Sequence, residues 1–93
     1  MKRTDKIANG TSFHDHTFTA TVDDLRNVLG QPKFESNDGQ DKCNFDWIME
    51  TQDGTVFTVY DWKEYRRLAE DETIEWHIGG RSGADTEKAL LEI

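Results

Sequence analysis

Strict alternation of apolar and polar side chains in the middle of the chain predicts a β-hairpin. The alternation runs over residues 45–51 and resumes over residues 56–62, and the pair Asp53-Gly54 lies between the two runs. An Asp-Gly pair in this position is typical of a two-residue type I′ turn. Counting outward from that turn predicts the cross-strand pairs Met49 with Thr58, Trp47 with Tyr60, Phe45 with Trp62, and Asp46 with Asp61.

The predicted register divides the hairpin side chains between an aromatic face and a mixed face. The aromatic face holds Phe45, Trp47, Met49, Thr58, Tyr60 and Trp62. Aromatic cross-strand pairs add roughly 0.2–1 kcal/mol each to the stability of a sheet, so we expect helices to cover this face. The mixed face holds Ile48, Phe57, Val59 and the carboxylates Asp46 and Asp61. Like charges directly opposite destabilise a sheet, so a cation, a basic partner residue or His77 is expected beside the two carboxylates.

Capping signals predict one short helix on each side of the hairpin. Thr21 and Asp24 have the spacing of a capping box, and Gly30 followed by Pro32 ends the helical periodicity that comes after them. Near the end of the chain, Ser82 occupies the capping position of a closing helix. Such short helices are marginal alone, so we expect both to pack on the sheet.

Two further extended segments complete the predicted fold. Alternation over residues 73–78 predicts a third strand that ends at Gly79-Gly80, and residues 12–20 have the β-branched and aromatic content of an irregular edge strand. Residues 1–12 are polar and predict a flexible N-terminal arm before a single domain over residues 13–93. The sequence therefore predicts an α+β fold, a three- to four-stranded antiparallel sheet with two short helices packed on one face.

The chain is strongly acidic. It has 19 Asp and Glu against 11 Lys and Arg, a formal net charge of −8. Nucleic acid is bound by basic surfaces that release counterions, so we expect no direct nucleic-acid binding and instead a protein partner with a basic surface. Solubility and imitation of DNA phosphates are alternative roles for the acidic surface, and the sequence leaves them open. The acidic residues expected to contact the partner are Asp23, Asp24, Asp46, Asp61, Glu70, Asp71 and Glu72.

The glycine pair after the third predicted strand is a candidate ligand site. In Gly79-Gly80-Arg81-Ser82, free backbone N–H groups at the start of a helix can hold an anion, with Arg81 adding charge and Ser82 a hydroxyl. His77 and an aromatic ring would complete a site for a nucleotide or another phosphate compound. The spacing matches neither the Walker motif nor GxGxxG, and a tight strand-to-helix connection is the alternative interpretation.

No constellation of catalytic residues is recognisable, so we expect neither an enzyme nor a cofactor. Cys43 is the single cysteine, and no histidine has the spacing that would suit a nucleophile and its base. His14 and His16 are two residues apart, as at the start of a metal site, but further ligands are lacking. No apolar run reaches the roughly 18 residues of a membrane span, so no membrane partner is expected.

Short motifs in the second half of the chain resemble small uncharacterised proteins of tailed bacteriophages. The shared pattern is DGTV at residues 53–56, YDW at residues 60–62, and EWHIGG at residues 75–80 followed by Ser82. The resemblance implies a viral protein that acts in the host cytoplasm, where it binds and inhibits a host protein in counter-defence or host takeover. Sequestration of a small molecule and a part in virion assembly are the alternative functions.

Overall fold

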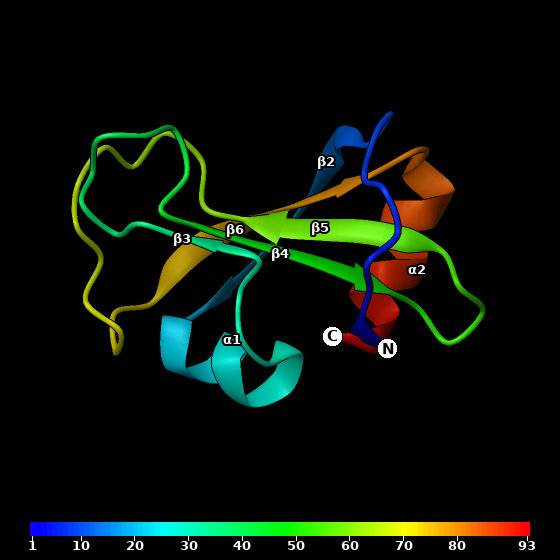
Figure 1. Cartoon of the computed structure of the whole chain (residues 1–93), viewed down its shortest axis with the longest axis horizontal. Helices are drawn as coiled ribbons and strands as arrows, with labels where there is room; N and C mark the ends of the chain where they lie inside the picture. The colour runs from blue at the N-terminus through cyan, green and yellow to red at the C-terminus, as the bar shows by residue number, and fades with distance from the viewer.

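The computed structural model covers residues 1–93 and is an α+β fold (Figure 1). The strands are β1 (Lys2–Arg3), β2 (Ser12–Ala20), β3 (Phe34–Glu35), β4 (Phe45–Glu50), β5 (Val56–Tyr60) and β6 (Ile74–Gly80), and the helices are α1 (Val22–Leu29) and α2 (Gly83–Glu92). The sheet has the order β1-β4-β5-β6-β2, and β3 also pairs with β4. All of these strand pairs are antiparallel.

The predicted α+β class, antiparallel sheet and two helices are confirmed, but the sheet has six strands rather than three or four. The additional strands β1 and β3 are two residues long, and both pair with the edge of β4 that faces away from β5. A strand of two residues is too short to show a hydrophobic period, so no sequence pattern predicts β1 or β3. Both strands form by pairing with the free edge of β4.

The hairpin between β4 and β5 turns through three residues, so the predicted two-residue turn is wrong. Thr51 N–H donates to Thr55 O and Gly54 N–H donates to Thr51 O, both at 2.9 Å. Gly54 has φ of 87°, as expected for a type I turn followed by a left-handed glycine. The Asp53 carboxylate accepts hydrogen bonds from both threonine hydroxyls and from Thr55 N–H. These bonds, together with one from Lys88, hold the pKa of Asp53 well below its usual range.

The longer loop shifts the strand register by one residue and corrects the predicted pairs. The observed pairs are Asp46 with Tyr60, Trp47 with Val59, Ile48 with Thr58, and Met49 with Phe57. A shift by one residue moves every side chain of a strand to the other face of the sheet. Phe57 and Val59 therefore lie in the core, whereas Tyr60 is half-buried on the opposite face. Asp61 is not the cross-strand partner of Asp46.

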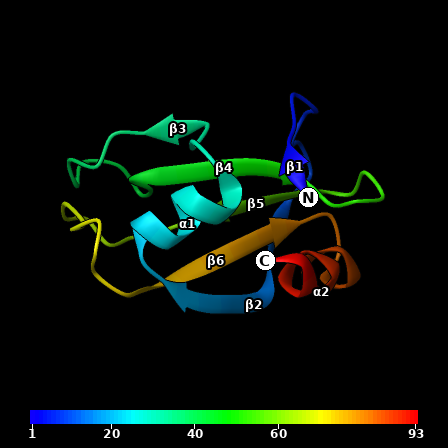
Figure 2. The same cartoon turned by 90° about the horizontal axis from the view of Figure 1, so that it is seen from below.

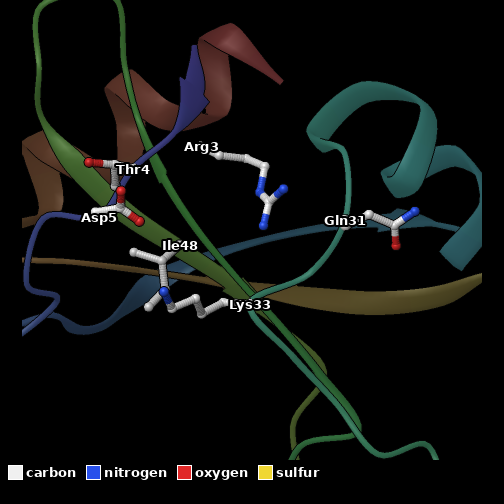
Figure 3. Close-up of a pocket in the computed structure, with 6 residues that line it drawn as sticks. All are labelled: Arg3, Thr4, Asp5, Gln31, Lys33 and Ile48. Atoms are coloured by element: carbon white, nitrogen blue, oxygen red, sulfur yellow. The ribbon is translucent and has the colours of Figure 1, made fainter.

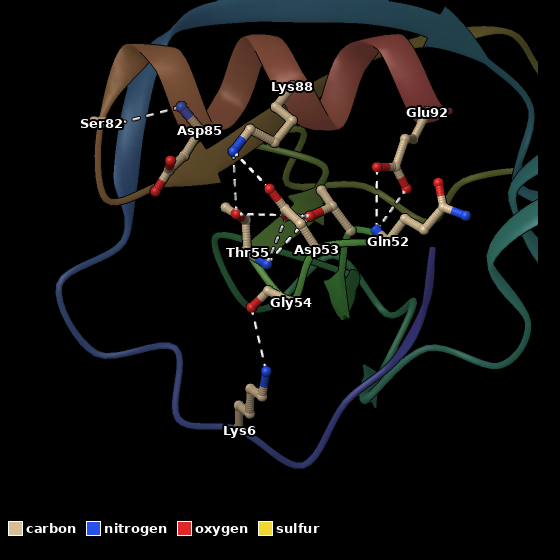
Figure 4. A network of polar contacts seen from close by, with 10 residues as sticks. Lys6, Gln52, Asp53, Gly54, Thr55, Ser82, Asp85, Lys88 and Glu92 are labelled. Atoms are coloured by element: carbon tan, nitrogen blue, oxygen red, sulfur yellow. Dashed lines mark hydrogen bonds and ion pairs between the residues drawn. The ribbon is translucent and has the colours of Figure 1, made fainter.

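The tip of the hairpin is tied to the last helix and to the first residues of the chain (Figure 4). Lys88 of α2 forms an ion pair with Asp53 at 2.9 Å, and the Glu92 carboxylate accepts from Gln52 N–H at 3.1 Å. Lys6 donates from Nζ to the carbonyl of the loop glycine at 3.2 Å. The loop that determines the register is thus held from both sides.

Both helices pack on one face of the sheet and share a single core with it (Figure 2). Thr21 and Asp24 form the predicted capping box of α1, and the Ser82 hydroxyl accepts from Asp85 N–H at the start of α2. The core consists of Val22, Leu25, Leu29, Phe45, Trp47, Met49, Phe57, Val59, Leu68, Ile74, Trp76, Ile78 and Ala89. The sheet face turned away from the helices is called the reverse face below.

Residues 4–11 cross one end of the reverse face. They connect β1 to β2, which lie at opposite edges of the sheet, and the helices occupy the other face. Ala8 and Thr11 of this crossing segment line a hollow together with Ile48 and Thr58 of the sheet. The remainder of the reverse face is not covered by another element.

Ionic contacts fasten residues 1–12, which the sequence predicted as a flexible arm. Lys2 and Lys6 form ion pairs with the nearly buried Glu50 at 3.2 and 2.6 Å. Arg81 donates to two backbone carbonyls of the crossing segment at 2.6 and 3.1 Å. These residues therefore lie against the sheet and contribute a strand to it, in place of a separate arm.

Gly79 and Gly80 lie inside β6, so the prediction that the strand stops before them is wrong. Gly79 pairs with Thr58 on one side and with Phe13 on the other. A Cβ atom on Gly79 would lie 2.4 Å from Thr58 Oγ1, a distance that requires something to move. Close packing within the sheet is therefore the reason for a glycine at this position.

We predict that Gly79→Ala lowers the free energy of unfolding by about 1–3 kcal/mol, the usual cost of overpacking. The matched control is Gly83→Ala at the first position of α2, where a Cβ would meet nothing within 4 Å. This control should leave stability unchanged or raise it by up to about 1 kcal/mol, because alanine favours a helix over glycine. Urea denaturation followed by circular dichroism measures both variants. Equal effects of the two substitutions would contradict the close approach at Gly79.

Candidate functional site

The open part of the reverse face is built from two cross-strand rows. Taken across β4, β5, β6 and β2, the first row is Asp46, Tyr60, His77 and Thr17, and the second is Ile48, Thr58, Gly79 and Phe13. Residues two apart along a strand point to the same side, so both rows face away from the helices. The sheet therefore presents a carboxylate, three rings and two hydroxyls on one surface.

Four rings line a cavity of about 350 Å³ on this surface: those of Phe13, Tyr60, Trp62 and His77. Tyr60 and His77 are stacked, with centroids 5.7 Å apart and planes 21° apart. Phe13 meets His77 edge to face at 4.8 Å, and Trp62 meets Tyr60 in the same manner at 6.0 Å. Phe13 is 41% exposed and Trp62 is 40% exposed, whereas the other two tryptophans are fully buried. We call this feature the ring cavity.

Two lysines flank the ring cavity. Lys42 Nζ lies 5.8 Å and Lys63 Nζ 5.4 Å from the centroid of the Trp62 ring. An ammonium over the face of a tryptophan is attracted by the ring quadrupole. Two positive charges thus lie beside Trp62, one of the four rings, although neither lysine lines the cavity itself.

A second hollow of about 250 Å³ adjoins the ring cavity and shares Tyr60 with it. Asp46, Thr58 and Cys43 contribute polar atoms to this hollow. Oδ1 of Asp46 is buried and has no hydrogen-bond partner, and the same holds for Nδ1 of His77 in the neighbouring cavity. Burial, reinforced by the charge of nearby Asp61, raises the pKa of Asp46 to about 6. We call this feature the Asp46 hollow.

Cys43 also lines the Asp46 hollow, and its surroundings keep it a thiol. Burial raises its pKa to about 11, and the carboxylates of Asp61 and Asp46 act in the same direction. Since the thiolate is the nucleophilic form of cysteine, a thiol held in this way is a poor nucleophile at neutral pH.

A third hollow, of about 300 Å³, lies at the outer edge of β4 and shares Ile48 with the Asp46 hollow (Figure 3). Arg3 and Lys33 contribute their charges to its lining together with Asp5. All three side chains belong to exposed residues, so this hollow is polar and wet. This hollow therefore lies at the edge of the sheet and meets the Asp46 hollow at Ile48.

The structure separates the seven acidic residues that the sequence predicted as partner contacts. Asp23, Glu70 and Asp71 line one hollow beside the start of α1. The Asp24 carboxylate caps α1, and Glu72 forms an ion pair with Arg66 at 2.6 Å. Asp46 lines the Asp46 hollow on the reverse face, and Asp61 is buried. Glu70 forms an ion pair with Arg26 at 3.0 Å, so three of the five carboxylates expected next to α1 have partners in the fold.

Asp61 is fully buried, which corrects the prediction that it contacts a partner. Its Oδ1 accepts hydrogen bonds from Asn44 N–H and Phe45 N–H, both at 2.8 Å, and Oδ2 accepts from Asn44 Nδ2 at 3.1 Å. A carboxylate with three donors at the start of β4 has a structural role. The one-residue shift in register places Asp61 inside the fold and leaves Asp46 on the reverse face.

The predicted ligand loop Gly79-Gly80-Arg81-Ser82 has its groups engaged within the protein. The two glycines pair inside the sheet, Arg81 holds the crossing segment, and the Ser82 hydroxyl caps α2. His77 is the one member of the predicted site that lines a cavity with aromatic rings. Phe13 and Trp62 were not predicted as site residues. The correct register of the hairpin would have placed Trp62 beside Tyr60, whereas Phe13 depends on the pairing of β2 with β6.

Other kinds of site find little support in the fold. His14 Nε2 lies 3.0 Å from Gly80 O and His16 Nδ1 lies 2.6 Å from Thr86 Oγ1, so the two histidines have different partners. No group of three or more His, Cys, Asp or Glu side chains is placed to hold a metal ion. Neither helix has the length and apolar character needed to cross a membrane.

Comparison of the chain with family models, with curated proteins and with solved structures gave no match. The resemblance to phage proteins therefore stays a prediction, and the geometry of the reverse face carries the functional argument.

Asp46 is expected to destabilise the folded protein at neutral pH. Its pKa rises from 3.8 to about 6, so the folded state holds this proton more tightly than the unfolded chain between these values. Stability therefore falls as pH rises through that window. We predict that Asp46→Asn raises the free energy of unfolding by about 1–2 kcal/mol at pH 7.5 and has little effect at pH 4.

Urea denaturation at the two pH values measures this effect. The exposed Asp41→Asn is the control for loss of one negative charge from the same part of the chain. A less stable Asp46→Asn protein at pH 7.5 would show that the carboxylate has a stabilising partner after all.

Proposed function

We propose that the protein is a non-catalytic binding protein that holds the planar aromatic ring of a small ligand in the ring cavity. The observation that carries this proposal is the exposure of Phe13 and Trp62, at 41% and 40%, around a cavity that two further rings complete. Small domains normally bury such side chains, and this one buries its other two tryptophans completely. Phe13 on β2 and Trp62, two residues beyond the end of β5, thus keep their rings at the surface, where they are suited to stack against a ligand.

The ring cavity is rigid at its base. Tyr60 and His77 lie on the central strands β5 and β6, and they are direct cross-strand partners. Sites carried by strands hold their geometry more precisely than sites carried by loops. Stacking of a base on an aromatic side chain contributes about 1–3 kcal/mol, so two or three such contacts suffice for a measurable affinity.

The size of the ring cavity and the net charge of the protein favour a small ligand with one ring system over a polymer. The cavity of about 350 Å³ is near the lower end of the volumes that hold small molecules. A net charge of −8 opposes the approach of a long nucleic acid, in agreement with the predicted absence of direct nucleic-acid binding. Lys42 and Lys63 beside Trp62 nevertheless offer local positive charge to one anionic group on a small ligand.

The aromatic residues supply the test of this proposal. Wild-type protein is titrated by calorimetry with GMP, AMP, CMP, UMP and free tryptophan. For the four nucleotides, quenching of the fluorescence of Trp62, the one exposed tryptophan, gives a second readout, which Trp62→Ala should remove. We predict that Phe13→Ala weakens binding of the best ligand by about 1–3 kcal/mol, measured by calorimetry, and that Trp62→Ala does the same.

The control for these substitutions is Tyr65→Ala, which removes a 53% exposed ring that is not part of the cavity. The proposal fails if no compound in the panel binds, or if Tyr65→Ala weakens binding as much as the two cavity variants do.

A second candidate function is binding of a host protein through the acidic hollow at α1. The observation in its favour is that three carboxylates, Asp23, Glu70 and Asp71, line one concave surface of about 410 Å³ against a single basic residue, Arg67. Of the three, Glu70 already has an ion-pair partner in Arg26. Such a surface suits a basic partner and would be sensitive to salt. This hypothesis retains the phage-type role that the sequence motifs imply.

The acidic candidate predicts salt-dependent capture. A partner retained from host lysate at low ionic strength should be lost near 0.5 M salt, where screening is nearly complete over about 5 Å. Asp23→Asn combined with Asp71→Asn should abolish capture, whereas Asp5→Asn at the other end of the chain should not. Capture that survives both high salt and the double substitution would exclude this surface as the binding site.

A further inference from the structure

We infer that the ring cavity and the Asp46 hollow form one continuous site, and that its ligand is a guanine nucleotide whose base donates to the Asp46 carboxylate. The inference rests on the proposed function and names the ligand class. Three observations carry it: the shared wall between the two hollows, the unpartnered carboxylate oxygen, and the two lysines beside Trp62.

The first observation is contiguity. Tyr60 lines both hollows, and it is the direct cross-strand partner of Asp46 on one side and of His77 on the other. Neighbouring strands lie about 4.8 Å apart, so the carboxylate is one strand spacing from the stacked pair of rings. A bicyclic base laid along the Tyr60 ring reaches Asp46 with one edge while its other end remains among the aromatic rings.

The second observation concerns hydrogen bonding. An ionised carboxylate only accepts, and Asp46 has a buried oxygen without a donor in the protein. A buried polar atom without a partner is costly. Rotation of the Asp46 side chain within the hollow that it lines would bring this oxygen to a ligand that supplies the missing donor. The carboxylate has two oxygens, and the best match is a group with two adjacent N–H donors on one edge.

Among the nucleobases, guanine alone presents two adjacent donors. Its ring N1–H and exocyclic amino group lie side by side on the Watson–Crick edge, where two parallel bonds to a carboxylate form. Adenine and cytosine offer an amino donor next to an acceptor nitrogen, which an ionised carboxylate repels. Uracil has one N–H between two carbonyl oxygens. The two acceptor oxygens of the Asp46 carboxylate therefore favour guanine over the other bases.

The third observation is the placement of charge. A guanidinium cation, such as an arginine side chain of a partner protein, also has paired donors and stacks on aromatic rings. Lys42 and Lys63 at the Trp62 end of the site disfavour a cation there and favour the phosphate of a nucleotide. A carboxylate beside Tyr60 and two ammonium groups beside Trp62 thus match a base and its phosphate.

The ionised form of Asp46 also lowers the stability of the free protein. Burial raises its pKa to about 6, so the ionised form present at neutral pH is disfavoured in the free protein. Groups held in a destabilised state inside a cavity are characteristic of functional sites. The residue is better explained by a ligand than by stability.

The experiment compares GMP with IMP, which lacks the exocyclic amino group, and with AMP, by calorimetry at pH 7.5. Wild-type protein should bind GMP about 10-fold or more tightly than either analogue, because one charged hydrogen bond is lost or reversed. Asp46→Asn should reduce this preference to about 3-fold or less. The matched control Asp41→Asn, which removes an exposed charge from the loop that precedes β4, should keep the full preference.

Each other outcome overturns a specific statement. Equal binding of GMP, IMP and AMP by wild-type protein overturns the guanine inference and leaves the ring-binding proposal intact. Binding of methylguanidine more tightly than GMP also overturns it, in favour of an arginine-type ligand. A guanine preference that survives Asp46→Asn removes Asp46 from the site. Failure of all these compounds to bind overturns the ring-binding proposal itself.

Discussion

The register of the central hairpin depends on the hydrogen bonds of one carboxylate, and the two faces of the domain depend on that register. Asp53 accepts from the hydroxyls of Thr51 and Thr55 and from Thr55 N–H, which closes a three-residue loop with Gly54 in the left-handed conformation. Because side chains alternate along a strand, a loop one residue shorter would exchange the faces of β5. Phe57 and Val59 would then leave the core, and Tyr60 would enter it.

Two aspartates show the consequence of this register most clearly. Asp61 turns inward, where three donors from Asn44 and Phe45 satisfy it, and it anchors the start of β4. Asp46 turns outward into a hollow where one of its oxygens has no donor. Burial raises the pKa of both carboxylates, but hydrogen bonds from Phe45 and Asn44 act against this shift at Asp61, whereas Asp46 has no such donors. Hydrogen-bond partners, rather than burial alone, separate a structural carboxylate from a candidate ligand contact.

Much of the fold could be predicted from the sequence, because its signals are local. The capping box of Thr21 and Asp24 and the alternation around Trp47 and Trp76 each involve neighbours along the chain, and they identified both helices and the main strands. The candidate site could not be predicted in the same way. It depends on a loop length that Asp53-Gly54 leaves ambiguous between two and three residues, and on the position of Phe13 across a bulge in β2. The Gly79-Gly80 pair was misinterpreted because tight packing against Thr58 and a phosphate loop both call for glycine.

The crossing segment explains why the rings remain exposed. A sheet with helices on one side must cover or solvate its other face, and here residues 4–11 cover only one end of it. Arg81 donates to two backbone carbonyls of the segment at that end. Glu50 forms ion pairs with Lys6 of the segment and with Lys2 just before it. Were the segment placed one row further along the strands, it would lie over Tyr60 and His77 and fill the cavity with the protein's own atoms. The same contacts that keep the N-terminal residues in place therefore leave the ring cavity free for a ligand.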